Sequence, residues 1–91
     1  MEQYIQENIV MIRHTLGYTQ TEFSDIVGIS RLHLGKIEAN KAEVKRTLAL
    51  AVMTVVIGEY YSGRRFDTES TAYQLLGHFV ERFQNMIMKM V

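Results

Sequence analysis

The chain of 91 residues has no cysteine, no proline and few glycines. Without cysteine it can form neither disulfides nor thiolate metal sites. Without proline, and with apolar residues recurring at helical spacing, it is expected to be all helical. The longest apolar stretch, Leu48 to Ile57, is about ten residues and too short to span a bilayer. No signal peptide is visible at the start, so we expect a cytoplasmic protein without membrane association.

Acidic and basic residues are equal in number, so the formal net charge is zero, but the charges are distributed unevenly along the chain. Residues 1–30 carry one basic residue against four acidic ones, a net charge of −3, whereas residues 31–46 carry five basic residues against two, a net of +3. Local sign matters more than the sum when a protein meets a phosphate backbone. The alternative is a solvated face of mixed charge without a partner.

Apolar residues make up 47% of the chain, which favours a globular domain over disorder. The length suits a single domain, 1–91, with a modest core. The periodicity predicts five helices, at about residues 2–16, 20–27, 31–39, 43–61 and 68–90. We expect the core to lie within about 2–61, with the last helix added for dimerisation.

Residues 19–38 read as two short helices joined by a tight turn. Thr19 and Glu22 form the pattern of a capping box, and Ser30 can cap the second helix. Gly28 lies between them, where a left-handed backbone conformation is favourable for glycine. This spacing predicts a helix-turn-helix, which can place its second helix in the major groove of DNA.

The segment from about Ile9 to Leu50 resembles the Cro/cI-like (XRE-type) helix-turn-helix family of phage and plasmid repressors. The chain departs from the family pattern after Glu38, where Ala39-Asn40-Lys41 replaces the usual Asn-Gly. The resemblance covers a little under half of the chain and rests on Arg13, Leu16-Gly17-Tyr18-Thr19-Gln20, Phe23, Ile26-Val27-Gly28-Ile29-Ser30, Leu34 and Lys36-Ile37-Glu38.

The outward face of the predicted recognition helix holds the candidate base-reading positions, which are Arg31, Leu32, Gly35 and Lys36. An arginine at the helix start can donate two hydrogen bonds to a guanine, and a leucine can contact a thymine methyl group. The lysine can reach a guanine or a phosphate. Glycine is unfavourable in an exposed helix, and either a close approach to DNA or chance accounts for it.

Other positions are candidates for contact with phosphates, which position a protein without reading sequence. They are Gln20, His33, Lys41, Lys45 and Arg46. For Gln20 the resemblance implies a phosphate contact and a brace for the recognition helix. It also implies a structural salt bridge between Arg13 and Glu38. For His33, simple exposure is the alternative, and Arg64 and Arg65 are either phosphate contacts or solvated.

The last predicted helix carries a heptad seam of apolar residues, typical of a helix that packs along a partner. A second stripe beside it consists of Tyr73, Val80 and Ile87. One interpretation places both stripes on the protein's own core, and the other gives one stripe to a second copy. We expect the seam to mediate dimerisation, through Ala72, Leu76, Phe79, Phe83, Met86 and Met90.

These features together predict a sequence-specific, DNA-binding transcriptional regulator, acting as a homodimeric repressor on a palindromic operator in a bacterial or phage-infected cell. The alternative is a helical protein-interaction module, antitoxin-like or an adaptor homodimer, with an architectural helix-turn-helix. No phosphate loop, paired metal-binding histidines or cysteine nucleophile is present, so we expect no enzyme, no cofactor and no metal. We also expect no small-molecule ligand.

Overall fold

The computed structural model describes residues 1–90, which form five helices and no strands. This confirms the expected all-α, five-helix class. The helices are α1 (Glu2–Leu16), α2 (Gln20–Val27), α3 (Arg31–Glu38), α4 (Arg46–Ser62) and α5 (Thr71–Lys89). The bounds of α1 and α2 are the predicted ones, and α3 ends one residue earlier than expected.

Local capping explains why the helix-turn-helix forms where it does. The hydroxyl of Thr19 accepts from the Glu22 amide at 3.1 Å, and the Glu22 carboxylate accepts from the Thr19 amide at 2.9 Å. Ser30 caps α3 by accepting from the His33 amide at 3.0 Å. Gly28, between the two helices, has a φ of 81°. These bonds satisfy backbone groups that a helix end leaves without partners.

The last two helices begin later than predicted. α4 begins at Arg46 rather than near Glu43, because the residues before it follow an irregular path. α5 begins at Thr71, with Ser70 as its cap, rather than at about residue 68. The carboxylate of Asp67 instead accepts from the Glu69 amide at 3.0 Å and closes a local turn.

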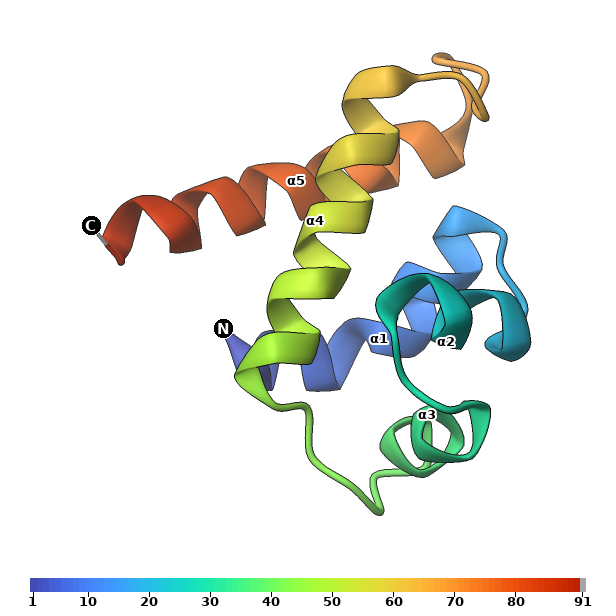
Figure 1. The fold of residues 1–91 in the computed structure, drawn as a ribbon. Coiled ribbons are helices and arrows are strands. Elements are labelled where there is room, and N and C mark those ends of the chain that lie inside the picture. The colour runs from blue at the N-terminus through green and yellow to red at the C-terminus, as the bar shows by residue number, and fades with distance from the viewer. Residues whose placement is uncertain (91) are drawn as a thin grey trace.

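One hydrophobic core joins side chains from all five helices. α4 runs through the middle of the molecule and contacts α1, α2 and α5, which accounts for its nearly all-round apolar sequence (Figure 1). α5 crosses α4 and contributes Leu76, Phe79, Val80 and Phe83 to the core. α5 is therefore part of the core and not an addition to a core made of residues 2–61.

The burial of the heptad seam contradicts part of the expected dimerisation face. Leu76 and Phe83 are fully buried within one chain and Phe79 is 3% exposed, so these three are not accessible to a second copy. They face α1 and α4, and the ring of Tyr4 meets Phe83 edge-on. Of the other seam positions, Ala72 and Met86 are half-buried and Met90 is exposed.

Candidate nucleic-acid interface

α3 turns one side to the protein core and the opposite side to solvent. Leu34 and Ile37 are fully buried and fix the orientation of the helix. Arg31, Leu32 and Lys36 are exposed, and 69% of the Leu32 surface is accessible to solvent. Three of the four predicted base-reading positions therefore lie open on the outward side of this helix.

Gly35, the fourth of these positions, is half-buried, yet a Cβ built on it would have no neighbouring atom within 4 Å. The fold therefore does not require a glycine there, and the reason for it has to lie outside the chain or in chance. His33 is exposed, and its backbone amide bonds to the Ser30 cap. Its ring remains free of any hydrogen bond within residues 1–90, so a phosphate contact by His33 stays a prediction.

An ion pair between α1 and α3 holds the recognition helix in place. The Arg13 guanidinium donates to both oxygens of the Glu38 carboxylate, from Nε at 2.7 Å and from Nη2 at 3.0 Å. The two side chains are only 11% and 9% exposed. The pair that the resemblance implies is therefore present, and its two-point geometry sets the angle as well as the distance between the helices.

Gln20 completes this arrangement from the start of α2, where its side-chain amide donates to Glu38 Oε1 at 3.0 Å. The brace that the resemblance implies is thus made through the same carboxylate that binds Arg13. An amide group carries two N–H donors, so one remains for another acceptor. Contact of Gln20 with a phosphate stays a prediction.

The environment of Glu38 also determines its ionisation. Burial by itself raises the pKa of this carboxyl, but the hydrogen bonds from Arg13 and Gln20 and the Arg13 charge outweigh burial and hold the pKa below its ordinary value. Glu38 therefore stays negative and keeps its partners. Removing one partner of a buried ion pair leaves the other charge uncompensated, which typically lowers the free energy of unfolding by about 3–5 kcal/mol.

The cations of residues 31–46 are all on the surface. They are Arg31, Lys36, Lys41, Lys45 and Arg46. Among the salt bridges of the described residues, only one includes a member of this set, a 3.6 Å contact between Lys45 and Glu43 with both side chains about 80% exposed or more. Such an exposed pair is weak, so Lys45 can readily turn to a phosphate.

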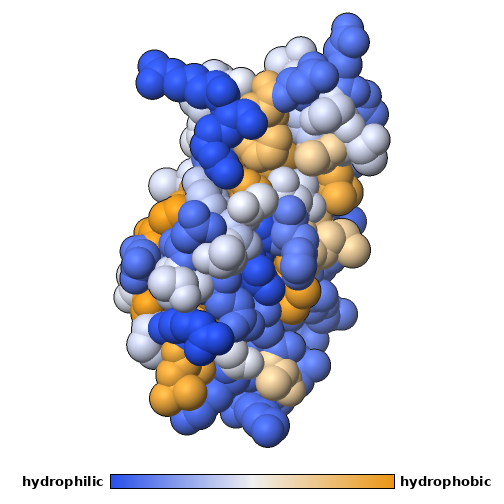
Figure 2. Space-filling view, turned by 90° about the vertical axis from the view of Figure 1, so that its right-hand side faces the viewer, coloured by the Kyte–Doolittle hydropathy of each residue, from blue (hydrophilic) through white to orange (hydrophobic). Residues whose placement is uncertain are grey.

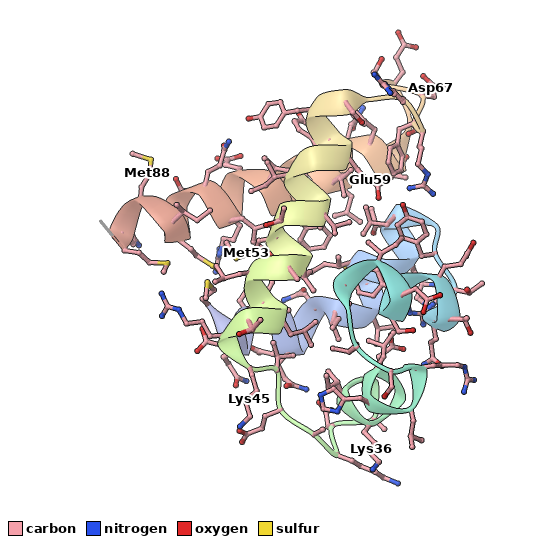
Figure 3. All side chains as sticks on the ribbon, viewed as in Figure 1. Lys36, Lys45, Met53, Glu59, Asp67 and Met88 are labelled. Atoms are coloured by element: carbon pink, nitrogen blue, oxygen red, sulfur yellow. The ribbon has the colours of Figure 1, made fainter. Side chains whose placement is uncertain are left out.

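These cations come from two different elements that meet at one end of the molecule. Lys36 from α3 and Lys45 from the residue before α4 both point outward at the end of the molecule away from α5 (Figure 3). The face that carries α2 and α3 is mainly hydrophilic, with hydrophobic residues in small separate groups (Figure 2). Lys36 and Lys45, which belong to different segments, therefore lie at the same end of the molecule.

Arg65, which the sequence left open as a phosphate contact or a solvated residue, has a structural role. It donates to the Leu16 carbonyl at the end of α1 at 2.9 Å and pairs with Glu59. Its guanidinium also lies 4.3 Å from the centre of the Tyr18 ring. These contacts tie the loop between α4 and α5 to the start of the helix-turn-helix.

Tyr18 takes part in the same cluster through its hydroxyl, which donates to Glu59 Oε2 at 2.5 Å. Burial, and then the hydrogen bond to Glu59, raise the pKa of this hydroxyl. The Tyr18 ring also stacks on Phe23, as a hydrophobic staple at the start of α2 requires. Nothing in the sequence signals the contact of Tyr18 with Glu59, which lies 41 positions away.

The part of the chain that the structure describes holds no group of three or more histidine, aspartate or glutamate side chains placed to bind a metal ion. Over residues 1–90, no helix combines the length and the apolar character needed to cross a membrane.

No protein-family model matches this chain, and no curated protein or solved structure matches it. Membership of the Cro/cI-like family therefore stays a prediction from the residues that carry the resemblance. Its functional meaning depends on the geometry and charge around α3.

Proposed function

We propose that this protein is a sequence-specific DNA-binding regulator that inserts α3 into the major groove, and that it represses transcription by occupying an operator. The observation that carries the proposal is the exposed outward side of α3, with Arg31 and Lys36 on it. The major groove, about 12 Å wide, admits an α-helix. Arg31 at the helix start can reach guanine O6 and N7, the commonest specific contact in such complexes.

The exposed cations beyond α3 support the same role. Lys41, Lys45 and Arg46 follow the recognition helix and supply charge for the phosphates that flank the groove. The pair of Arg13 with Glu38 prevents α3 from changing its angle, so that base-reading and phosphate-binding groups keep a constant relation. A DNA-binding protein benefits from such rigidity because ordering side chains on binding costs free energy.

A second copy is part of the proposal, because one short helix reads too few bases. At about 1.5 Å per residue, the eight residues of α3 extend over only a few base pairs. A symmetric dimer reads two half-sites about 34 Å apart and produces a palindromic operator. Since the middle of the seam is buried, we place the second copy at the exposed end of α5, which extends beyond α1 and α4 (Figure 1).

The apolar residues at that end of α5 are Ile87, Met88 and Met90, which are 38%, 74% and 47% exposed. Replacing Met88 with glutamate should give a folded monomer, because the side chain contributes nothing to the core. Phe83→Asp is the contrasting variant and should unfold the protein, because Phe83 is fully buried. Light scattering and circular dichroism separate the two effects, and a dimeric Met88→Glu variant would place the second copy elsewhere.

Selection of bound sites from random duplex DNA tests the proposal as a whole. A palindromic consensus supports both DNA reading and the symmetric dimer. A matched selection with Arg31→Ala and Lys36→Ala together should lose the consensus and keep weak binding to all sequences. Recovery of no enriched sequence by the unaltered protein would refute the proposal.

Exposed apolar residues on the helix-turn-helix favour a second candidate, a protein-interaction module of the antitoxin or adaptor kind. Leu32 of α3 is 69% exposed and Ile26 of α2 is 44% exposed, so both side chains are accessible for apolar contact with a protein partner. If the protein is an interaction module, Leu32→Asp should abolish binding of the protein partner. The unaltered protein should then show no salt-dependent binding to DNA. In the DNA-binding candidate the same substitution lowers affinity by charge repulsion and leaves a clear salt dependence.

A further inference from the structure

The segment from 39 to 45 joins α3 to α4 and carries two of the candidate phosphate contacts, Lys41 and Lys45. Its first turn is fixed locally, because Asn40 takes the left-handed conformation with a φ of 59°. The Lys41 amide then donates to the Lys36 carbonyl at 2.8 Å, which closes the end of α3. Asn40 thus does what a glycine commonly does at this point, although the chain departs from the family pattern here.

After this turn the backbone of the segment lacks hydrogen bonds to other backbone groups. Within residues 1–90, no backbone-to-backbone hydrogen bond involves residues 42–44. The buried Val44 side chain, 5% exposed, anchors the segment to the core. Half-buried Ala42 also packs against the core. These apolar contacts fix positions along the segment, but they satisfy none of its backbone N–H and C=O groups.

The side chain of Gln6, on α1, supplies the missing hydrogen bonds. Its Oε1 accepts from the Val44 amide at 2.7 Å. Its Nε2 lies 3.2 Å from the Ile37 carbonyl, 3.3 Å from the Ala42 carbonyl and 3.4 Å from the Asn40 Oδ1. Two N–H groups thus serve three acceptors, and the acceptor oxygen serves one donor. One half-buried side chain therefore connects the last turn of α3 with the far end of the segment.

We propose that Gln6 is a positioning residue that sets the placement of Lys41 and Lys45 relative to α3, and so the register between base reading and phosphate contact. This inference rests on the proposed function. Gln6 itself is separated from Val44 by 38 positions and does not need to touch DNA. It acts by holding the loop whose lysines do.

The chemistry of the position accounts for the residue type. The site requires a side chain that donates to carbonyl oxygens and accepts from an amide N–H at the same time. A carboxylate accepts only, an ammonium donates only, and an apolar side chain does neither. The glutamine side-chain amide meets both demands at once, because it carries two N–H donors and one acceptor oxygen.

The test uses the full chain with Gln6→Met, which keeps the length of the side chain and removes its hydrogen bonds, and Gln6→Ala as a second variant. Gln74→Ala is the matched control, because Gln74 is an exposed helical glutamine on α5. Hydrogen exchange followed by NMR should show that exchange of the Val44 amide accelerates about tenfold or more in both Gln6 variants. Exchange of the Leu34 and Ile37 amides should remain as in the unaltered protein.

DNA binding supplies the second readout. In the Gln6 variants the slope of log affinity against log salt should become shallower by about one or two, since each lost phosphate contact removes about 0.9 from it. The ratio between selected and random DNA should stay unchanged, because α3 keeps its own supports. Gln74→Ala should match the unaltered protein in slope, ratio and amide exchange.

Two results separate the inference from the proposed function. If the unaltered protein binds DNA and the Gln6 variants keep its salt slope, or if the Val44 amide stays protected in them, the positioning role is wrong and the proposed function stands. If the unaltered protein shows no salt-dependent DNA binding, the proposed function fails and the positioning role fails with it. In that case, faster exchange of the Val44 amide in the Gln6 variants would show only that Gln6 orders the segment from 39 to 45.

Discussion

Gly77 of α5 lies against the aromatic ring of Tyr60 of α4, so closely that a Cβ on the glycine would stand 3.0 Å from the ring carbon Cε1 and 3.1 Å from the hydroxyl oxygen. The ring has little freedom to withdraw, because it stacks on Tyr73 with 4.7 Å between ring centres. The Tyr73 hydroxyl in turn donates to the Tyr60 carbonyl at 2.9 Å. α4 and α5 therefore cross closely at Gly77.

Gly77→Ala should therefore destabilise the protein by about 1 kcal/mol, since overpacking typically costs about 1–3 kcal/mol and the gain in helix propensity returns up to about 1 kcal/mol. Gly58→Ala on α4 is the matched control. A Cβ there meets nothing within 4 Å, so this variant should gain up to about 1 kcal/mol. Urea unfolding of both variants measures the difference, and equal stability of the two would contradict a tight crossing.

The seam on α5 shows the limit of prediction from periodicity. The repeat of apolar residues correctly marks Leu76, Phe79 and Phe83 as packed positions, but a repeat is the same whether the facing helix belongs to the same chain or to another. The contact of Gly77 with Tyr60 joins two helices and has no signature in the local sequence. For this reason three of the six expected dimerisation positions proved to belong to the protein's own core, while dimerisation itself stays a prediction.

The first three helices were predicted much better, because local signals determine them. Thr19, Glu22, Gly28 and Ser30 act within a few positions of their partners, and each cap forms as expected. The start of α4 was misplaced because Gln6 holds the preceding residues from a distance of more than 30 positions. Local sequence carries no trace of such a long-range hydrogen bond.

The stability of the protein should fall in acid in a way that depends on Glu38. Because hydrogen bonds and the Arg13 charge lower the pKa of this carboxyl against the opposing effect of burial, the folded protein binds a proton there less tightly than the unfolded chain. The contribution is complete above the ordinary value of 4.5 and is lost as the pH falls through the lower pKa of the folded state.

Glu38→Gln should accordingly flatten the loss of stability below about pH 4.5 and reduce stability at pH 7. Glu43→Gln provides the control, because Glu43 is exposed and its ion pair with Lys45 is weak. Urea unfolding at a series of pH values gives both curves. If the Glu38→Gln curve runs parallel to that of the unaltered protein, Glu38 does not account for the acid sensitivity.

Arg31→Ala should weaken binding to the selected operator by about 1–3 kcal/mol and relax the preference at one base pair of each half-site. The fold should be unchanged, because the Arg31 side chain is exposed and in no salt bridge of the described chain. Arg82→Ala removes an exposed arginine of α5 and serves as the control. Equal losses for the two variants would exclude Arg31 as a base reader.

Lys45→Ala should weaken binding to selected and random DNA alike and reduce the salt slope by about 0.9, as expected for one lost phosphate contact. Glu43→Ala offers an opposite change at the same place, because Glu43 lies 3.6 Å from Lys45 and repels phosphate. This variant should bind all DNA more tightly. A sequence-dependent effect of Lys45→Ala would assign it to base reading instead.

The most direct test of α3 as the DNA-contacting element is an NMR titration of the isotope-labelled protein with a random-sequence duplex at low salt. We expect the amide signals of residues 31–46 to shift, the shifts to reverse when salt is added, and the signals of α5 to stay in place. Shifts confined to α5, or no shift in residues 31–46 at low salt, would contradict the account.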